Sequence, residues 1–196
     1  MTSTIPSRTH WTDWLRQRWP SALAVVAAAL ILVDDASESS DEAIRSLGEL
    51  LPFLPLLYLV VAKLQRRRAT WPTLIVGTLV ITMLQIVEVI APSVVFVAVA
   101  LIVLVWGAID GQLHRPGEST TMFRAQALGM IGFGGLALVA LAVDAEVGRY
   151  LVAAGWFLHG IWDLVHLRLD KVVSRSYAEA CGVLDILVAL SLVFLL

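Results

Sequence analysis

The residues best suited to chemistry lie in the segment HGIWDLVH, residues 159–166, inside an otherwise apolar run. His159, Asp163 and His166 stand at positions i, i+4 and i+7, so on a helix they lie within about 60° of one another on a single face. Imidazole nitrogens and carboxylate oxygens are the usual ligands of zinc and iron. The pattern fits a divalent metal such as zinc, a proton or ligand site, or polar contacts that only join helices.

A second polar stripe follows in the last apolar segment of the chain. Tyr177, Cys181 and Asp185 are spaced i, i+4 and i+8 on one helix face. A short loop separates this segment from the HGIWDLVH helix, so the two helices are expected to be antiparallel neighbours, with Asp185 at about the depth of Asp163. We therefore expect one shared site, lined by Tyr177 and Cys181. The predicted metal ligands of this site are His159, Asp163, His166 and Asp185.

Further polar residues are candidates for the same site. Asp163 and Asp185 are the expected proton donor or acceptor, with Asp110 near them on the cytoplasmic side. If a metal is bound, it would act as a Lewis acid or activate water. A third polar stripe in the segment 70–90 is expected to line the cavity, with its last member nearer the outside. The residues of this stripe are Thr78, Thr82 and Gln85, with Glu88 at its edge, where Glu88 lines the outer part of the cavity or faces the outer headgroups.

The composition indicates a membrane protein. Of the 196 residues, 59% are hydrophobic and 15% are charged, and the mean hydropathy is +0.83. Soluble domains are about 45–50% apolar and about 25% charged. The net charge of −2 gives no basic surface for nucleic acid, and the single cysteine, Cys181, allows no intrachain disulfide. The expected surroundings are the lipid bilayer and a lipid-like small molecule.

The apolar runs predict an all-α fold with seven transmembrane helices in a single membrane domain over residues 1–196. A membrane span needs about 20 mostly apolar residues. The apolar stretch 69–109 is about twice that length, and Ala91-Pro92 is its natural break. The predicted helices cover residues 19–33, 47–64, 70–90, 92–112, 122–143, 147–169 and 177–196.

The basic residues predict the orientation, because lysine and arginine concentrate in cytoplasmic loops. Under seven spans, most of them fall on the side of the N-terminus, while the acidic segment DDASESSDE falls on the other. We expect a protein of the cytoplasmic membrane with its N-terminus inside and its C-terminus outside. If the first helix were a cleaved signal, six spans would remain. The basic residues on the cytoplasmic side are Arg8, Arg16, Arg18, Lys63, Arg66, Arg67, Arg68, Arg115, Arg124, Arg168, Lys171 and Arg175.

Small residues follow one another at helical spacing in the fifth predicted helix, at Ala125, Gly129, Gly132 and Gly135. Small residues let another backbone approach closely. Helix packing is the expected role of this stripe, and a groove for substrate is the alternative.

The C-terminal pattern AAGWFLHGIWDLVH…SRSYAEACGVLDILVA resembles small bacterial multi-pass membrane proteins, a likeness that implies no activity. Seven helices with His and Asp near the cytoplasmic side are also similar to the hemolysin III and progestin-receptor-like group of membrane metal-dependent hydrolases. That group has histidines on its second helix and a His-x-x-x-His pair on its last. This chain has neither, and offers Asp185 on its last helix, so no residue role is carried over. Small membrane terpene cyclases, which use buried acids without a metal, are a third analogy, with Glu88 and Asp185 as the acids.

These features favour a membrane-embedded enzyme acting on a lipid-like or isoprenoid substrate. A proton-coupled transporter or carrier and a structural or regulatory membrane protein without catalysis are the alternatives. An enzyme requires access to Asp163 and Asp185, a carrier requires polar lining that continues past Gln85 and Glu88, and a scaffold requires neither. No nucleophile elbow, P-loop, dinucleotide fingerprint or H-E-x-x-H motif occurs in the sequence.

Overall fold

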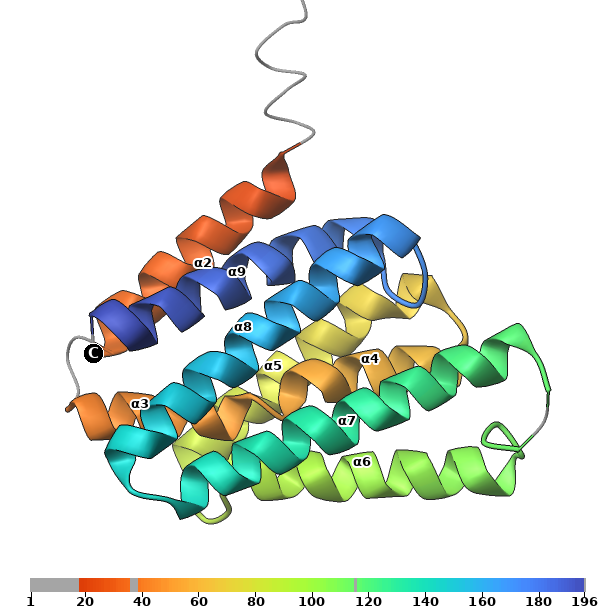
Figure 1. The fold of residues 1–196 in the computed structure, drawn as a ribbon, viewed down its shortest axis with the longest axis horizontal. Helices are drawn as coiled ribbons and strands as arrows, with labels where there is room; N and C mark the ends of the chain where they lie inside the picture. The colour runs from red at the N-terminus through yellow and green to blue at the C-terminus, as the bar shows by residue number, and fades with distance from the viewer. Residues whose placement is uncertain (1–17, 36–38, 115, 196) are drawn as a thin grey trace, which may run out of the picture.

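The computed structural model describes residues 18–35, 39–114 and 116–195, and within these ranges the chain forms helices and turns without a strand. The helices form one bundle, which Figure 1 shows with the last helix beside the first. Their bounds are α2 Trp19–Asp35, α3 Ser40–Leu50, α4 Phe53–Leu64, the short 3-10 turn η1 Arg67–Ala69, α5 Thr70–Val87, α6 Pro92–Ile109, α7 Glu118–Ala142, α8 Ala145–Leu169 and α9 Arg175–Phe194.

The all-α prediction is confirmed, and the helix expected over residues 47–64 begins earlier than predicted. Ser39 caps α3: its side chain accepts a hydrogen bond from the Glu42 amide, and the Glu42 carboxylate accepts one from the Ser39 amide. Residues that the sequence placed in an acidic loop therefore belong to this helix. Pro52, which has no amide hydrogen, separates α3 from α4. The two segments together form one stretch of 25 residues, Ser40–Leu64.

Five helical stretches are long and apolar enough to cross a membrane. The apolar part of α2 is shorter, and α8 is as long as a span but carries His159, Asp163 and His166. Large apolar side chains are exposed on the outside of the bundle, with Leu128 at 70% and Ile86 at 72%. Exposed apolar surface of this extent is typical of a protein that faces lipid. The five stretches are Ser40–Leu64, Arg67–Val87, Pro92–Ile109, Glu118–Ala142 and Arg175–Phe194.

The arrangement of the helices positions α4, α8 and α9 around the centre of the bundle. α4 is buried along nearly its whole length and packs against α5, α6 and α7, while α2 covers α9. α8 and α9 lie side by side in the closest packing of the bundle (Figure 1). A Cβ atom at Gly160 would lie 3.3 Å from the carbonyl oxygen of Gly182. Glycine at these positions lets the two backbones approach closely.

The loops that the sequence assigned to the cytoplasmic side lie at one end of the bundle. Arg67 forms an ion pair of 2.5 Å with Asp170, and Lys171 forms one of 2.5 Å with Glu118, so the connections before α5, α7 and α9 meet there. The hydrogen bond from Arg67 lowers the pKa of the Asp170 carboxyl. The predicted orientation also used Arg8, Arg16 and Arg115, which lie outside the described residues.

Candidate functional site

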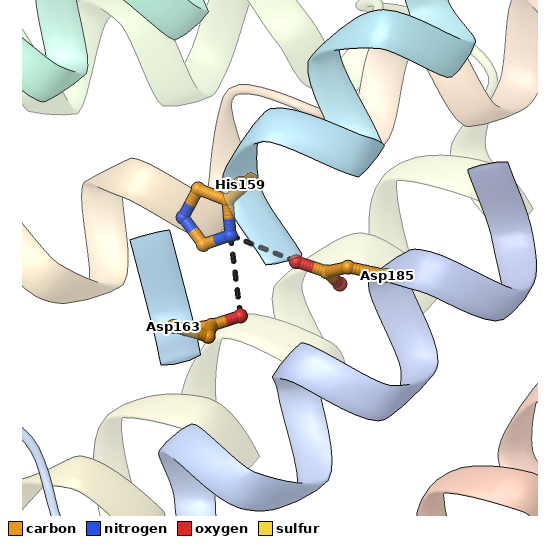
Figure 2. Close-up of side chains that lie close together, drawn as sticks. All are labelled: His159, Asp163 and Asp185. Carbon is orange, nitrogen blue, oxygen red and sulfur yellow. Dashed lines mark hydrogen bonds and ion pairs between the residues drawn. The ribbon is translucent and has the colours of Figure 1, made fainter. Parts of the chain in front are cut away.

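Three side chains of α8 and α9 form a fully buried centre, which we call the His159–Asp163–Asp185 centre (Figure 2). The Nδ1 atom of His159 lies 2.8 Å from Oδ2 of Asp185 and 3.5 Å from Oδ2 of Asp163. One potential ligand atom of each residue lies within 4.8 Å of the other two. The two polar stripes that the sequence placed on neighbouring helices therefore meet.

The spacing of residues and two glycines explain why the centre forms. His159 and Asp163 are one turn apart on α8, so both side chains point to the same side of that helix. A Cβ atom at Gly182 would lie 3.2 Å from Cβ of Asp163, and one at Gly160 would lie 3.3 Å from Cβ of Asp185. The two glycines thus leave the space in which the carboxyl groups of the facing helix lie.

Tyr58 is a member of the site that the sequence reasoning missed. It lies on α4, is fully buried, and its hydroxyl donates a hydrogen bond to Oδ1 of Asp163. Its ring meets the imidazole of His159 edge-on, with the ring centroids 5.7 Å apart. The available signal was a single tyrosine within the apolar run LPLLYLVVA, because a buried hydroxyl needs a partner.

The centre holds two carboxyl groups and one imidazole without contact to solvent. Two ionised carboxylates beside one imidazolium would leave a net negative charge in a low-dielectric interior, which is costly unless a proton or a cation compensates it. Within this centre, three buried atoms have no hydrogen-bond partner among the described residues: His159 Nε2, Asp163 Oδ2 and Asp185 Oδ1. Buried polar atoms are nearly always partnered, so these atoms are available to a proton or a cation.

His166, the fourth predicted ligand, is not one of the three residues that the structure brings together in this centre. Its Nδ1–H donates to the carbonyl oxygen of Trp162 at 2.9 Å, and its Nε2 accepts from the amide of Gln126 at 3.0 Å. Both ring nitrogens are therefore occupied, as in a neutral imidazole. Gln126, a buried residue of α7, was not foreseen, and its oxygen accepts a hydrogen bond from the Trp162 indole at 3.3 Å.

Tyr177 and Cys181 lie on α9 beside the centre, and both are buried. The Tyr177 ring contacts that of Tyr58, with the centroids 6.1 Å apart, and its hydroxyl has no partner within the described ranges. Cys181 is a free thiol one turn before Asp185. The structure thus places both residues on the buried face of α9 that also carries Asp185.

The structure pairs Asp110 with Lys63 and not with a residue of the centre. Its carboxylate forms an ion pair with Lys63 at 2.5 Å, and the Lys63 ammonium also lies 4.4 Å from the centroid of the Trp106 ring. The Lys63 side chain is 3% exposed and lies in the last turn of α4, so the pair is at the end of the bundle. The sequence reasoning used Lys63 only as an orientation signal and missed this pairing.

The third polar stripe also lies elsewhere. Thr82 is exposed on α5, and its hydroxyl donates to the carbonyl oxygen of Thr78 in the same helix. Gln85 and Glu88 line a cavity of about 380 Å³ between the end of α5, the start of α6 and α3, where Arg45 also lies. The prediction that these residues line the same cavity as Asp163 does not hold, because α5 packs at the rim of the bundle.

The centre is closed in this structure. His159, Asp163 and Asp185 have no exposed surface, and the cavities at the ends of the bundle and along α3 are lined by other side chains. Access to the centre therefore requires a side chain or a helix to move.

No protein-family model, curated protein or solved structure matches this chain. The likeness to bacterial membrane proteins and to membrane hydrolases stays a prediction. The chemistry of the site is therefore argued from its own residues. One imidazole and two carboxylates, with Tyr58 hydrogen-bonded to one of them, form a donor set that fits zinc or another divalent metal, since ligating carboxylates are commonly held by such outer hydrogen bonds.

Proposed function

We propose that the protein is a multi-pass protein of the cytoplasmic membrane, with its N-terminus inside and its C-terminus outside. The five apolar helical stretches and the exposed apolar side chains support the membrane location. The meeting of the basic connections at one end of the bundle supports the orientation.

We propose further that the His159–Asp163–Asp185 centre binds a divalent metal such as zinc and serves a membrane-embedded enzyme. The observation that carries this proposal is a set of three ligand-type side chains, all fully buried, whose ligand atoms lie within 4.8 Å of one another. Three protein ligands leave a coordination position open, as in catalytic zinc sites. A bound metal would polarise an oxygen of the substrate or activate water.

The residues of the chain have separate roles in this proposal. Tyr58 holds Oδ1 of Asp163, so that Oδ2 remains free to face the imidazole. Asp185 and Asp163 both face Nδ1 of His159, at 2.8 Å and 3.5 Å, so a metal held at Nδ1 would take the place of the hydrogen bond between His159 and Asp185. Asp163 and Asp185 are the groups that can hold or release a proton beside the substrate.

The depth of the centre favours a lipid-like or isoprenoid substrate. His159 precedes the end of α8 at Leu169 by ten residues, which corresponds to about 15 Å along the helix axis. A centre at this depth lies within the hydrocarbon region of a bilayer. A lipid-like molecule is already dissolved there, whereas a water-soluble substrate would have to leave water.

The test is the metal content of the purified protein, isolated in mild detergent without chelators. We expect a stoichiometric divalent metal in the wild type, its loss in His159→Ala, and its retention in His166→Ala, because His166 lies outside the centre. His114→Ala, which removes an exposed histidine from a turn, is the matched control. A wild-type protein without metal would overturn the proposal.

A second candidate is a centre that holds a proton in place of a metal. The observation in its favour is the direct 2.8 Å contact of His159 Nδ1 with Asp185, which is a complete hydrogen bond without any ion. Under this candidate the wild type contains no metal, and proton uptake by protein-containing liposomes is abolished by Asp185→Asn. The exposure of Thr82 on α5 gives no support to a continuous polar path for a carrier.

A further inference from the structure

The wall around the His159–Asp163–Asp185 centre differs in thickness from side to side. On the α4 side, Tyr58 and its neighbours are fully buried behind α5 and α6. On the α9 side, α2 forms a further layer. On the α7 side, the aromatic rings of Phe133 and Trp162 contact the imidazoles directly, and both rings are themselves partly exposed. This last side separates the centre from the surroundings by one layer of side chains.

The two rings form a continuous cover. Phe133 of α7 meets the His159 imidazole edge-on at a centroid distance of 5.1 Å and lies 6.1 Å from the Trp162 ring. Trp162 of α8 in turn lies 5.1 Å from the His166 ring. A Cβ atom at Gly129 would lie 3.3 Å from the Trp162 indole, so glycine at this position lets the indole lie close against α7.

The outer side of this cover faces the bilayer. Leu158 and Val165 of α8, which lie within about 60° of Trp162 around the helix, are exposed at 50% and 45%, and a Cβ atom at Gly132 of α7 would meet open space. Figure 1 shows α7 and α8 diverging from their shared turn, with α4 visible behind them. In a bilayer, an acyl or prenyl chain would therefore contact the exposed side chains of α8 that flank Trp162.

We propose that Phe133 and Trp162 form a lateral gate, through which one linear apolar chain passes from the bilayer between α7 and α8 to His159. The identification of that chain as substrate rests on the proposed function, whereas the route rests on the packing alone. Rotation of a partly exposed side chain takes place in nanoseconds or less and needs no movement of a helix. The gate explains how a centre without a cavity can receive a lipid-like molecule.

The test uses the full-length protein in phosphatidylcholine vesicles that contain a phospholipid with a photoreactive diazirine at the end of one acyl chain. After irradiation, adducts at His159 and Asp163 are mapped by mass spectrometry and divided by adducts at the lipid-facing Ile131. We expect Phe133→Ala to raise this ratio several-fold over the wild type. Phe157→Ala, which truncates an exposed phenylalanine elsewhere on α8, should leave it unchanged.

Phe133→Trp provides a second variant that keeps the interior covered. In Phe133→Trp, the ratio of adducts at His159 and Asp163 to adducts at Ile131 should be equal to the wild-type ratio or lower. The proposal is overturned if Phe133→Ala does not raise the ratio, if Phe157→Ala raises it equally, or if Phe133→Trp raises it. Metal content measured on the same samples separates the two proposals. If the labelling ratio of Phe133→Ala rises but the protein contains no metal, the gate is retained and the metal centre is rejected. If the ratio is unchanged and the protein contains metal, the metal centre is retained and the gate is rejected.

Discussion

Two stretches of the chain have the same mean hydropathy and opposite positions in the fold. Ser40–Leu64 contains α3 and α4, and 78% of its most apolar 18-residue segment is buried. Arg67–Val87 contains α5, and only 6% of the corresponding segment is buried. In water such a difference would be visible in the sequence, because exposed faces are polar. In a bilayer the exterior is as apolar as the interior, so hydropathy predicts that a helix exists without predicting where it packs.

The hydrogen bonds of polar side chains distinguish a buried helix from one at the rim, which hydropathy does not. On α4, Tyr58 and Lys63 are buried, and each is bound to a carboxylate of another helix. On α5, the Thr82 hydroxyl is exposed and is satisfied by the backbone of its own helix. The polar groups of the buried helix thus bind to other helices, and the polar group of the rim helix binds to the backbone of its own helix. Substitutions in the two regions should differ accordingly.

The largest effect is expected for His159→Ala. This substitution leaves two buried carboxyl groups without their imidazole, and removal of one partner of a buried pair costs about 3–5 kcal/mol. The measurement is thermal unfolding in detergent, followed by circular dichroism. Thr82→Val, the control on α5, should change stability by less than about 0.5 kcal/mol. An equal loss of stability in His159→Ala and Thr82→Val would show that the buried centre and the rim helix do not differ in this respect.

A smaller effect is expected for Gly160→Ala at the contact of α8 with α9. The added methyl group would meet the Gly182 carbonyl oxygen at 3.3 Å and Ile186 Cγ1 at 3.0 Å, and overpacking of this kind costs about 1–3 kcal/mol. The same change at Gly132 places a methyl group in open space, where it should be neutral or slightly stabilising. The readout is again the unfolding temperature. A tolerated Gly160→Ala would show that the two helices can move apart without loss.

Tyr58→Phe should have a more modest effect on stability, because single hydrogen bonds between membrane helices average about 0.6 kcal/mol and reach about 1.7 kcal/mol. Its effect on metal affinity should be larger, about 10–100-fold, since Tyr58 orients Asp163. A chelator competition assay measures this loss. Tyr150→Phe, which removes an exposed hydroxyl, should leave the affinity unchanged. An unchanged affinity in Tyr58→Phe would remove Tyr58 from the site.

The smallest effect is expected at the end of the bundle, for the exposed pair of Arg67 and Asp170. The pKa of Asp170 is lowered in the folded protein by the hydrogen bond from Arg67, so the pair stabilises the fold fully above the ordinary aspartate value of 3.8. That contribution is lost as the pH falls through the lowered value. Asp170→Asn should slightly reduce the unfolding temperature at neutral pH and leave it unchanged at strongly acidic pH. A difference that persisted in acid would assign the effect to packing.

The sequence predicted the all-α fold and the meeting of α8 with α9, because the length of the apolar runs and the spacing of residues along one helix determine them. It did not predict Tyr58 or Gln126, which approach from α4 and α7, because the packing of distant helices has no periodic signature in an apolar chain. Asp110 was misplaced for the same reason: its partner Lys63 lies 47 positions away. His166 lies on the predicted face of α8, but its Nε2 atom is hydrogen-bonded to the side chain of Gln126.

The contact of Gly160 with Gly182 has a mechanical consequence. Cβ atoms at Gly160 and Gly182 would lie 3.0–3.3 Å from atoms of the facing helix, so α8 and α9 pack with no room for a larger residue at this point. We therefore expect the two helices to move together, which would keep His159 close to Asp185 while the rest of the bundle fluctuates. Any motion that exposes the centre must then come from α7 or its side chains. The protein can therefore open to the bilayer while His159, Asp163 and Asp185 stay together.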